Sequence, residues 1–178
     1  MEKDEVKRKY DGFASKYDRT ERPLEFLGLR RLRRRLLARA SGKVLETAVG
    51  TGMNIPFYPP SCEVTAVDVS SGMVERARRK AAKRGLPVDF RLMDAETLEF
   101  DDETFDTIVN SMSTCTFSDP VKALQEMGRV CKKDGMILLL EHGRSDGRIL
   151  GRLQDWRARQ LCQEAGLRVE PGARGDGA

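Results

Sequence analysis

The clearest chemical signal in the sequence is an acidic residue followed by two glycines, in the stretch VLETAVGTG. Glu46 ends an apolar run, and Gly50 and Gly52 follow within six residues. A strand that runs into a glycine turn brings backbone N–H groups close to a bound nucleotide-like ligand. Asp68 ends the next apolar run, where a carboxylate can accept hydrogen bonds from both hydroxyls of a ribose.

The residue three positions after Gly52 bears on whether that ligand contains a pyrophosphate. The fingerprint of dinucleotide-binding proteins has a third glycine there, whereas this sequence has Ile55. Without that glycine, helix and strand approach less closely and a pyrophosphate loses support. The favoured ligand is therefore an adenosine without a pyrophosphate, and a nicotinamide oxidoreductase is a distant alternative.

The elements that must position these residues follow from the pattern after Val44. Short apolar runs alternate with helical segments, which is typical of an α/β fold with a doubly wound, Rossmann-like parallel sheet covered by helices on both faces. Strands are predicted over 43–47, 63–70, 88–95, 105–111 and 136–142. Helices are predicted over 72–85, capped by Ser70 or Ser71, and over 119–131. The last strand is nearly all apolar, so we expect it to be covered on both faces.

The N-terminal part of the chain is basic. Residues 1–43 hold 14 Lys and Arg against 7 Asp and Glu, about +7, while the whole chain carries +4. Within it, a helix is predicted whose apolar stripe consists of Leu29, Leu32, Leu36 and Ala40. The rest of its surface carries six arginines, namely Arg30, Arg31, Arg33, Arg34, Arg35 and Arg39.

The arginine-rich helix has three interpretations. It is a cover helix with a solvated basic face, or it binds an anionic membrane surface, or it binds a nucleic-acid backbone. Aromatic residues that would stack on bases are not interleaved with the arginines, so the membrane is favoured over nucleic acid, and no nucleic-acid partner is expected.

The organisation predicted from these patterns is one main domain with two different ends. Residues 1–43 form a helical, basic cap segment, residues 44–170 form the ligand-binding domain, and the Gly-rich residues 171–178 are disordered. The four cysteines form no CxxC pair, so no metal site is expected. No run of 18 apolar residues occurs, which favours a cytoplasmic protein, with peripheral membrane association as the alternative.

Five segments in series resemble the class I S-adenosylmethionine-dependent methyltransferases, particularly the methyltransferase type 11 group. They are LETAVGTG, AVDVSSGMVERAR, LMDAETLEF, FDTIVNSMSTCTFSDP and RVCKKDGMILLLEHGRS. The resemblance runs from about Tyr10 to about Ser145 and implies S-adenosyl-L-methionine as the cofactor. One such match would be weak, whereas five in the same order are specific.

The resemblance also implies residue roles. Glu46 lies near the methionine moiety of the cofactor, and the turn at Gly50 and Gly52 admits its backbone contact. The other implied contacts are the ribose hydroxyls for Asp68, the adenine ring for Val69 and Met73, the adenine amino group for Asp94, the ring for the amide of Ala95, and the methionine part and the acceptor for Asn110.

One position departs from the family pattern. The first glycine of the usual Gly-x-Gly-x-Gly is Ala48 here. A methyl group is tolerable there at negative φ and costly at positive φ.

Two further residues are candidates for catalysis. GFASKYD resembles the N-terminal stretch of quinone C-methyltransferases, in which Tyr17 would fold over the cofactor and contact its sulfonium by a cation–π interaction. Ordinary packing is the alternative for Tyr17. His142, the only histidine, follows the last strand and is either a general base or a strand-ending residue bonded to backbone.

The methyl acceptor is left open by the resemblance. The sequence is similar to bacterial phospholipid N-methyltransferases, quinone C-methyltransferases and methyltransferase-like thiol methyltransferases, so a small-molecule or lipid-like amine, thiol or quinone is expected. The alternative function is a truncated or degenerate module that binds cofactor or a partner without turnover, which Ala48 and the short region after the last strand favour.

Overall fold

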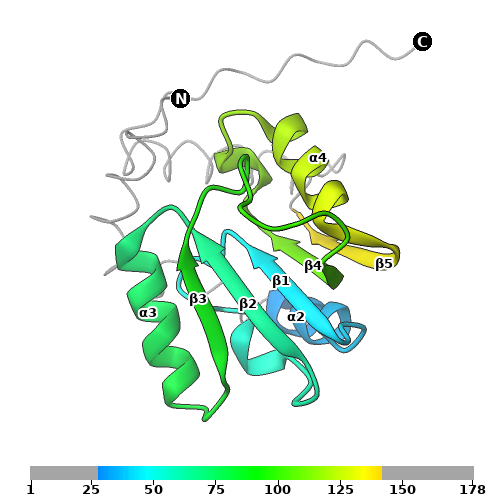
Figure 1. Ribbon diagram of the computed structural model, residues 1–178. Coiled ribbons are helices and arrows are strands. Elements are labelled where there is room, and N and C mark those ends of the chain that lie inside the picture. The colour runs from blue at the N-terminus through cyan, green and yellow to red at the C-terminus, as the bar shows by residue number, and fades with distance from the viewer. Residues whose placement is uncertain (1–27, 142–178) are drawn as a thin grey trace, which may run out of the picture. The chain divides into compact units, whose positions relative to one another are not determined.

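The chain is described from residue 28 to residue 141 by a computed structural model, and its centre is a five-stranded sheet. The strands are β1 (Lys43–Thr47), β2 (Glu63–Asp68), β3 (Val88–Leu92), β4 (Phe105–Ser111) and β5 (Cys131–Leu140). All neighbouring strands are parallel, in the order β3-β2-β1-β4-β5 (Figure 1). The predicted doubly wound α/β fold is confirmed.

The strand order reverses beside β1. From this central strand the chain builds outward through β2 and β3, then crosses to β4 and β5 on the other side. Ligands of open parallel sheets bind at the carboxyl ends of the strands, at such a reversal. The topology therefore predicts a ligand site at the ends of β1 and β4, where Thr47 pairs with Asn110.

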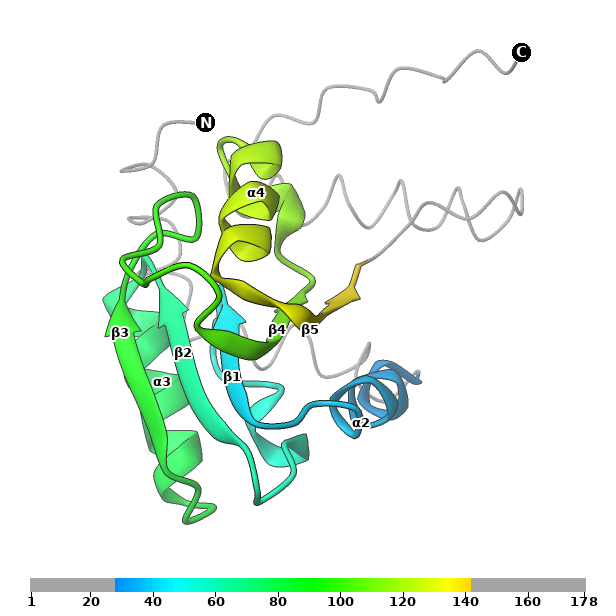
Figure 2. The ribbon, with the colours of Figure 1, turned by 45° about the vertical axis from the view of Figure 1, so that its right-hand side comes forward.

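Helices cover both faces of the sheet because neighbouring strand residues point to opposite sides. On one face, Leu37 at the end of α2 (Arg30–Leu37) and Ala40, shortly after the helix, pack with Val44 of β1. The same face receives α3 (Ser71–Ala82), which contacts β2 and β3. The other face is covered by α4 (Pro120–Val130), as the turned view in Figure 2 shows.

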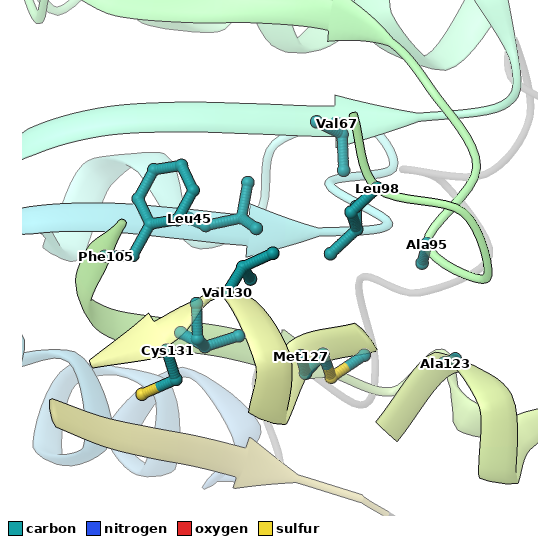
Figure 3. Close-up of a cluster of buried hydrophobic side chains, with 10 residues drawn as sticks. Leu45, Val67, Ala95, Leu98, Phe105, Ala123, Met127, Val130 and Cys131 are labelled. Carbon is teal, nitrogen blue, oxygen red and sulfur yellow. The ribbon is translucent and has the colours of Figure 1, made fainter. Parts of the chain in front are cut away.

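The core under α4 shows how the sequence builds this second face. Leu45 of β1 and Ile108 of β4 point to the face opposite α2, where they pack with Met127 and Val130 of α4. The loop after β3 adds Leu98 to the same cluster (Figure 3). Burial of these side chains holds the loop against the sheet and so fixes the chain that follows the end of β3.

Capping residues fix two of the helix starts. The Ser70 hydroxyl accepts a 3.2 Å hydrogen bond from the amide of Met73, as predicted for the start of α3. Asp119 accepts a 3.0 Å bond from the amide of Lys122 and caps α4, whose first residue is Pro120. The α3 helix ends at Ala82, three residues before the predicted end at Gly85.

Three predictions about the sheet and its cover are wrong. In α2 the buried positions are Arg33 and Leu37, whereas Leu32, placed on the apolar stripe by the sequence pattern, is 49% exposed. The strand predicted over 136–142 begins five residues earlier, because β5 starts at Cys131. Among the described residues β5 is an edge strand, and Leu139, expected to be covered, is 47% exposed.

Candidate functional site

The carboxyl ends of β1, β2 and β4 bring the predicted polar residues to one edge of the sheet. Glu46 and Thr47 end β1, Asp68 ends β2, and Asn110 is the penultimate residue of β4. All four side chains are buried. This is the placement expected of residues that bind a ligand at the point where the strand order reverses.

The turn after β1 has the backbone shape that the sequence predicted. Gly50 and Gly52 have φ of 55° and 75°. A Cβ atom on Gly52 would lie 3.0 Å from the backbone of Ala77 in α3, so that position has no room for a side chain. A Cβ atom on Gly50 would meet nothing within 4 Å, so the turn leaves open space there for a ligand to approach.

Ala48 takes the costly of its two alternatives. Its φ is 52°, in the left-handed region that favours glycine. For a residue with a Cβ, this conformation costs about 1–2 kcal/mol. The turn thus keeps the conformation of a glycine-rich motif although one of the glycines is replaced.

Asp68 links the glycine turn to the start of α3. One carboxylate oxygen accepts a 2.8 Å bond from the amide of Gly50, and the other accepts a 2.9 Å bond from the amide of Ser70. A carboxylate offers about four acceptor positions, and these two bonds orient the group. This chemistry fits a pair of ribose hydroxyls.

A buried polar cluster surrounds Glu46 on the other side of the turn. Its two carboxyl oxygens accept 2.8 Å bonds from the Asn54 amide nitrogen and from the Tyr58 hydroxyl. Asn54 precedes η2 (Ile55–Phe57) and Tyr58 follows it, so this 3₁₀-helix presents both donors to β1. Ile55, which stands where a third glycine would be, is itself a core residue.

Burial changes the acidity of this cluster. Desolvation raises the pKa of Glu46 from 4.5 to about 7, against the opposing effects of Tyr58, Asn54 and the Arg33 charge. Burial together with the nearby Glu46 raises the pKa of Tyr58 well above its ordinary value. The cluster therefore holds one carboxyl group that can gain or lose a proton near neutral pH.

Arg33 enters the same cluster from α2. Its guanidinium donates a 2.8 Å bond to Asn54 Oδ1 and a 2.9 Å bond to Ser111 Oγ at the end of β4. The Asn54 amide also donates to Ser111 over 2.7 Å. The side chain is only 6% exposed, so the expectation that Arg33 belongs to a solvated basic face is wrong. An arginine with buried polar partners can be held inside, whereas an unpartnered one cannot.

Asn110 anchors a second polar cluster on the β4–β5 side. Its oxygen accepts bonds from the hydroxyls of Ser113 and Thr47, and its nitrogen donates to Thr114 and to Glu141. Glu141 also accepts a 2.7 Å bond from the Thr114 hydroxyl. Asn110 thus holds the turn after β4, and its contact with a cofactor or an acceptor stays a prediction.

The remaining predicted contacts surround the end of β3 and the start of α3. The Asp94 carboxylate accepts a 2.9 Å bond from the amide of Glu96, which stiffens the loop after β3. Ala95 is 5% exposed and packs in the core beneath α4, and Met73 is 2% exposed. Val69 is half-buried beside Asp68. Tyr17 and His142 lie outside the described residues.

Four polar residues of the cluster around Glu46 were not predicted from the sequence: Arg33, Asn54, Tyr58 and Ser111. Asn54 and Tyr58 lie two and six residues after Gly52, so their polar type close to the glycine turn is the signal that could have identified them. Arg33 carries no such signal, because it is one of many arginines in its segment.

No metal site is found between residues 28 and 141. No group of three or more His, Cys, Asp and Glu side chains there is placed to hold an ion. In the same part of the chain, no helix is both long enough and apolar enough to cross a bilayer.

Known proteins resemble the chain over the region that forms this site. A family model described as a methyltransferase domain matches residues 45–139. Phosphatidylethanolamine N-methyltransferase of Cereibacter sphaeroides is 40% identical over 144 residues, which cover 80% of this chain and 70% of that protein. The ubiquinone/menaquinone biosynthesis C-methyltransferase UbiE of Bdellovibrio bacteriovorus is 31% identical over 169 residues, which cover 90% of this chain and 72% of that protein.

A solved structure agrees with the fold. The crystal structure of the YcgJ protein of Bacillus subtilis superposes with a TM-score of 0.61 at 32% identity, and the match covers 75% of this chain and 58% of that one. The chain therefore belongs to the methyltransferase domain family and is an enzyme whose methyl donor is S-adenosyl-L-methionine.

Proposed function

We propose that this chain transfers the methyl group of S-adenosyl-L-methionine to a lipid-like acceptor, with an amine-bearing phospholipid as the first candidate. The choice of acceptor is supported by the 40% identity to a phosphatidylethanolamine N-methyltransferase over most of this chain. A quinone precursor is the second candidate, which the similarity to a quinone C-methyltransferase supports.

In this proposal the two halves of the site divide the donor between them. Asp68 accepts the ribose hydroxyls, and the loop at Asp94 and Ala95 receives the adenine together with Val69 and Met73. Glu46 faces the methionine part from the end of β1. The bound donor supplies an electrophilic methyl group on a sulfonium, so the residues have to orient it and to exclude water more than to activate it.

The acceptor side of the proposal lies at the ends of β4 and β5. Asn110, Thr114 and Glu141 form a bonded cluster there, and His142 follows directly in the sequence. An amine acceptor has to be unprotonated to attack a methyl group, so a general base is useful. We assign that role to His142, and a lid role to Tyr17.

We also propose that α2 brings the enzyme to an anionic membrane surface. Four of its arginines are exposed, namely Arg30, Arg31, Arg34 and Arg35, as is Arg39 just after the helix, and Leu32 is exposed among them. Each basic side chain near an anionic bilayer contributes about 1 kcal/mol of attraction. A lipid acceptor would make this surface useful, because the substrate itself lies in the membrane.

The first test is calorimetric titration of the full chain with S-adenosyl-L-homocysteine, with NADH as the control. Binding of the former alone supports the donor site, and a labelled-methyl assay then compares phosphatidylethanolamine vesicles, a demethylated quinone and an alkyl thiol. Methylation of the phospholipid supports the proposal. Donor binding without transfer to any of the three would favour the module without turnover.

Membrane binding is tested by sedimentation with phosphatidylglycerol-containing vesicles. A variant with Arg30, Arg31 and Arg35 all changed to Gln should lose most of its vesicle binding and keep its affinity for S-adenosyl-L-homocysteine. The matched control changes Arg79, Lys83 and Arg84, three exposed cations at the end of α3, to Gln. Equal losses in both variants would contradict a specific role for α2.

A further inference from the structure

The six arginines between residues 30 and 39 do not share one environment. Arg33 is 6% exposed, whereas its neighbours Arg34 and Arg35 are exposed. Burying a guanidinium is costly unless polar partners replace its water, and here they do, at Asn54 and Ser111. A basic helix that served only as a cover or as a membrane surface would have no need of this arrangement.

The partners of Arg33 are the side chains that surround Glu46. Asn54 accepts from Arg33 with its oxygen and donates with its nitrogen to the Glu46 carboxyl, both over 2.8 Å. Ser111 accepts from Arg33 and from the same Asn54 nitrogen. One side chain therefore fixes the amide orientation of Asn54, and through it the donor that faces Glu46.

Arg33 also acts on Glu46 through its charge. The groups that face this carboxyl are Arg33 from α2, Tyr58 after η2 and Asp68 from β2, while β4 contributes the uncharged Ser111 through Asn54. The positive charge of Arg33 favours the ionised carboxylate, and the negative charge of Asp68 opposes it. Arg33 is the cation in this set.

We infer that Arg33 is a positioning residue of the donor site: it orients Asn54 and Ser111 around Glu46 and sustains the negative charge that Glu46 presents to the ammonium group of the donor. This inference rests on the proposed function, in which Glu46 faces the methionine part. An ionised Glu46 attracts the ammonium group, whereas a protonated one does not, so affinity should rise with pH as Glu46 loses its proton.

The decisive comparison uses Arg33→Gln, Arg33→Lys and the matched control Arg35→Gln. Glutamine keeps a donor but has no charge, lysine keeps the charge, and Arg35 is exposed on the same helix. Affinity for S-adenosyl-L-homocysteine is measured by calorimetry from pH 6 to pH 9. The parent and Arg35→Gln should show a rise centred near pH 7, where Glu46 loses its proton.

In Arg33→Gln the centre of that rise should move up by about one pH unit, because a nearby cation has been removed. At pH 7 the ionised fraction of Glu46 then falls from about one half to about one tenth, and affinity falls about fivefold. In Arg33→Lys most of this upward shift should be absent, because lysine keeps the positive charge. A profile for Arg33→Gln that coincides with that of Arg35→Gln would overturn the inference.

A measurement without ligand separates failure of this inference from failure of the donor site. Carbon-13 NMR titration of the Glu46 carboxyl should show a higher pKa in Arg33→Gln than in the parent, with Arg33→Lys between them. An unchanged Glu46 titration would overturn the inference even if ligand binding were intact. Absence of binding by the parent at every pH would overturn the donor site, and the role of Arg33 toward it.

Discussion

The Tyr58 hydroxyl donates a 2.8 Å hydrogen bond to Glu46, and both side chains are buried. The second carboxyl oxygen of Glu46 is held by the Asn54 amide over the same distance. Neutral donors thus surround an acid whose pKa is raised by burial to about 7. A carboxyl in this setting affects both the stability of the fold and the charge of the site.

The first prediction concerns stability against pH. The pKa of Glu46 is about 7 in the folded chain and near 4.5 when unfolded, so the folded state alone holds this proton between those two values. Stability should therefore fall as pH rises from about 4.5 to about 7, by about 3 kcal/mol from this residue. Urea denaturation at pH 5 and pH 8 measures the difference.

Glu46→Gln should remove this pH-dependent contribution, because the amide does not ionise. The variant should be more stable than the parent at pH 8, and the gap should close toward pH 5. Glu63→Gln, at an exposed position at the start of β2, is the control and should leave the profile of the parent unchanged. A parent profile as flat as that of Glu46→Gln would contradict a raised pKa at this position.

The second prediction removes the Tyr58 hydroxyl. Tyr58→Phe keeps the ring in the core and leaves one Glu46 oxygen without that donor, which should destabilise the fold by about 1–3 kcal/mol. The Tyr58 bond lowers the pKa of Glu46, so its loss should raise that pKa further. Carbon-13 NMR titration of Glu46 checks the direction, and a lower pKa in the variant would contradict this account.

Thr104→Val is the comparison for Tyr58→Phe, because it removes a hydroxyl that donates to the Asp101 carbonyl at an exposed position. It should leave the Glu46 titration where it is in the parent. A shift of equal size in both variants would indicate a general effect on the fold instead of the loss of one hydrogen bond.

The fold could be predicted from the sequence because its buried strands coincide with short apolar runs. The bounds of β1 and β4 match their predicted ranges, and Ser70 caps α3 as expected. β5 differs because Cys131 already pairs with Phe105, and a register shift follows before Thr107 pairs with Met136. Because β5 pairs with β4, it includes the polar residues 132–135, whose local composition does not predict a strand.

The site was predictable only where a residue type and its spacing imply a backbone shape or a strand end. Gly50, Gly52 and Asp68 satisfy that condition. Arg33 does not, because helical periodicity predicted Leu32 on the buried face and the polar partners of Arg33 come from Asn54 and Ser111, distant in sequence. Long-range hydrogen bonds decide which arginine is buried, and they follow from the tertiary fold.

The third prediction concerns Ala48. At a φ of 52° its Cβ is strained, so Ala48→Gly should stabilise the fold by about 1 kcal/mol. Ala38→Gly is the control, since Ala38 has a φ of −59° at the end of α2 and should lose about 0.5–1 kcal/mol. Urea denaturation of both variants measures the contrast. A loss of stability in Ala48→Gly would show that the methyl group contributes packing that outweighs the strain.

The last prediction concerns Asp68, whose two oxygens accept amides from the glycine turn and from the start of α3. Asn has only one acceptor oxygen, so in Asp68→Asn one of the two amides faces an NH₂ group and the turn loses its anchor. We expect a loss of about 1–3 kcal/mol in stability, and a loss of at least about 2 kcal/mol in affinity for S-adenosyl-L-homocysteine.

Calorimetry and urea denaturation, applied to the same preparations, keep these two effects of Asp68→Asn apart. Asp89→Asn in β3 is the matched control, because that carboxylate is exposed and paired with Arg91 on the surface. It should change neither affinity nor stability by more than about 0.5 kcal/mol. If Asp68→Asn bound S-adenosyl-L-homocysteine as the parent does, ribose recognition by Asp68 would be wrong, because an amide cannot replace a carboxylate that accepts two hydroxyls while it holds two amides.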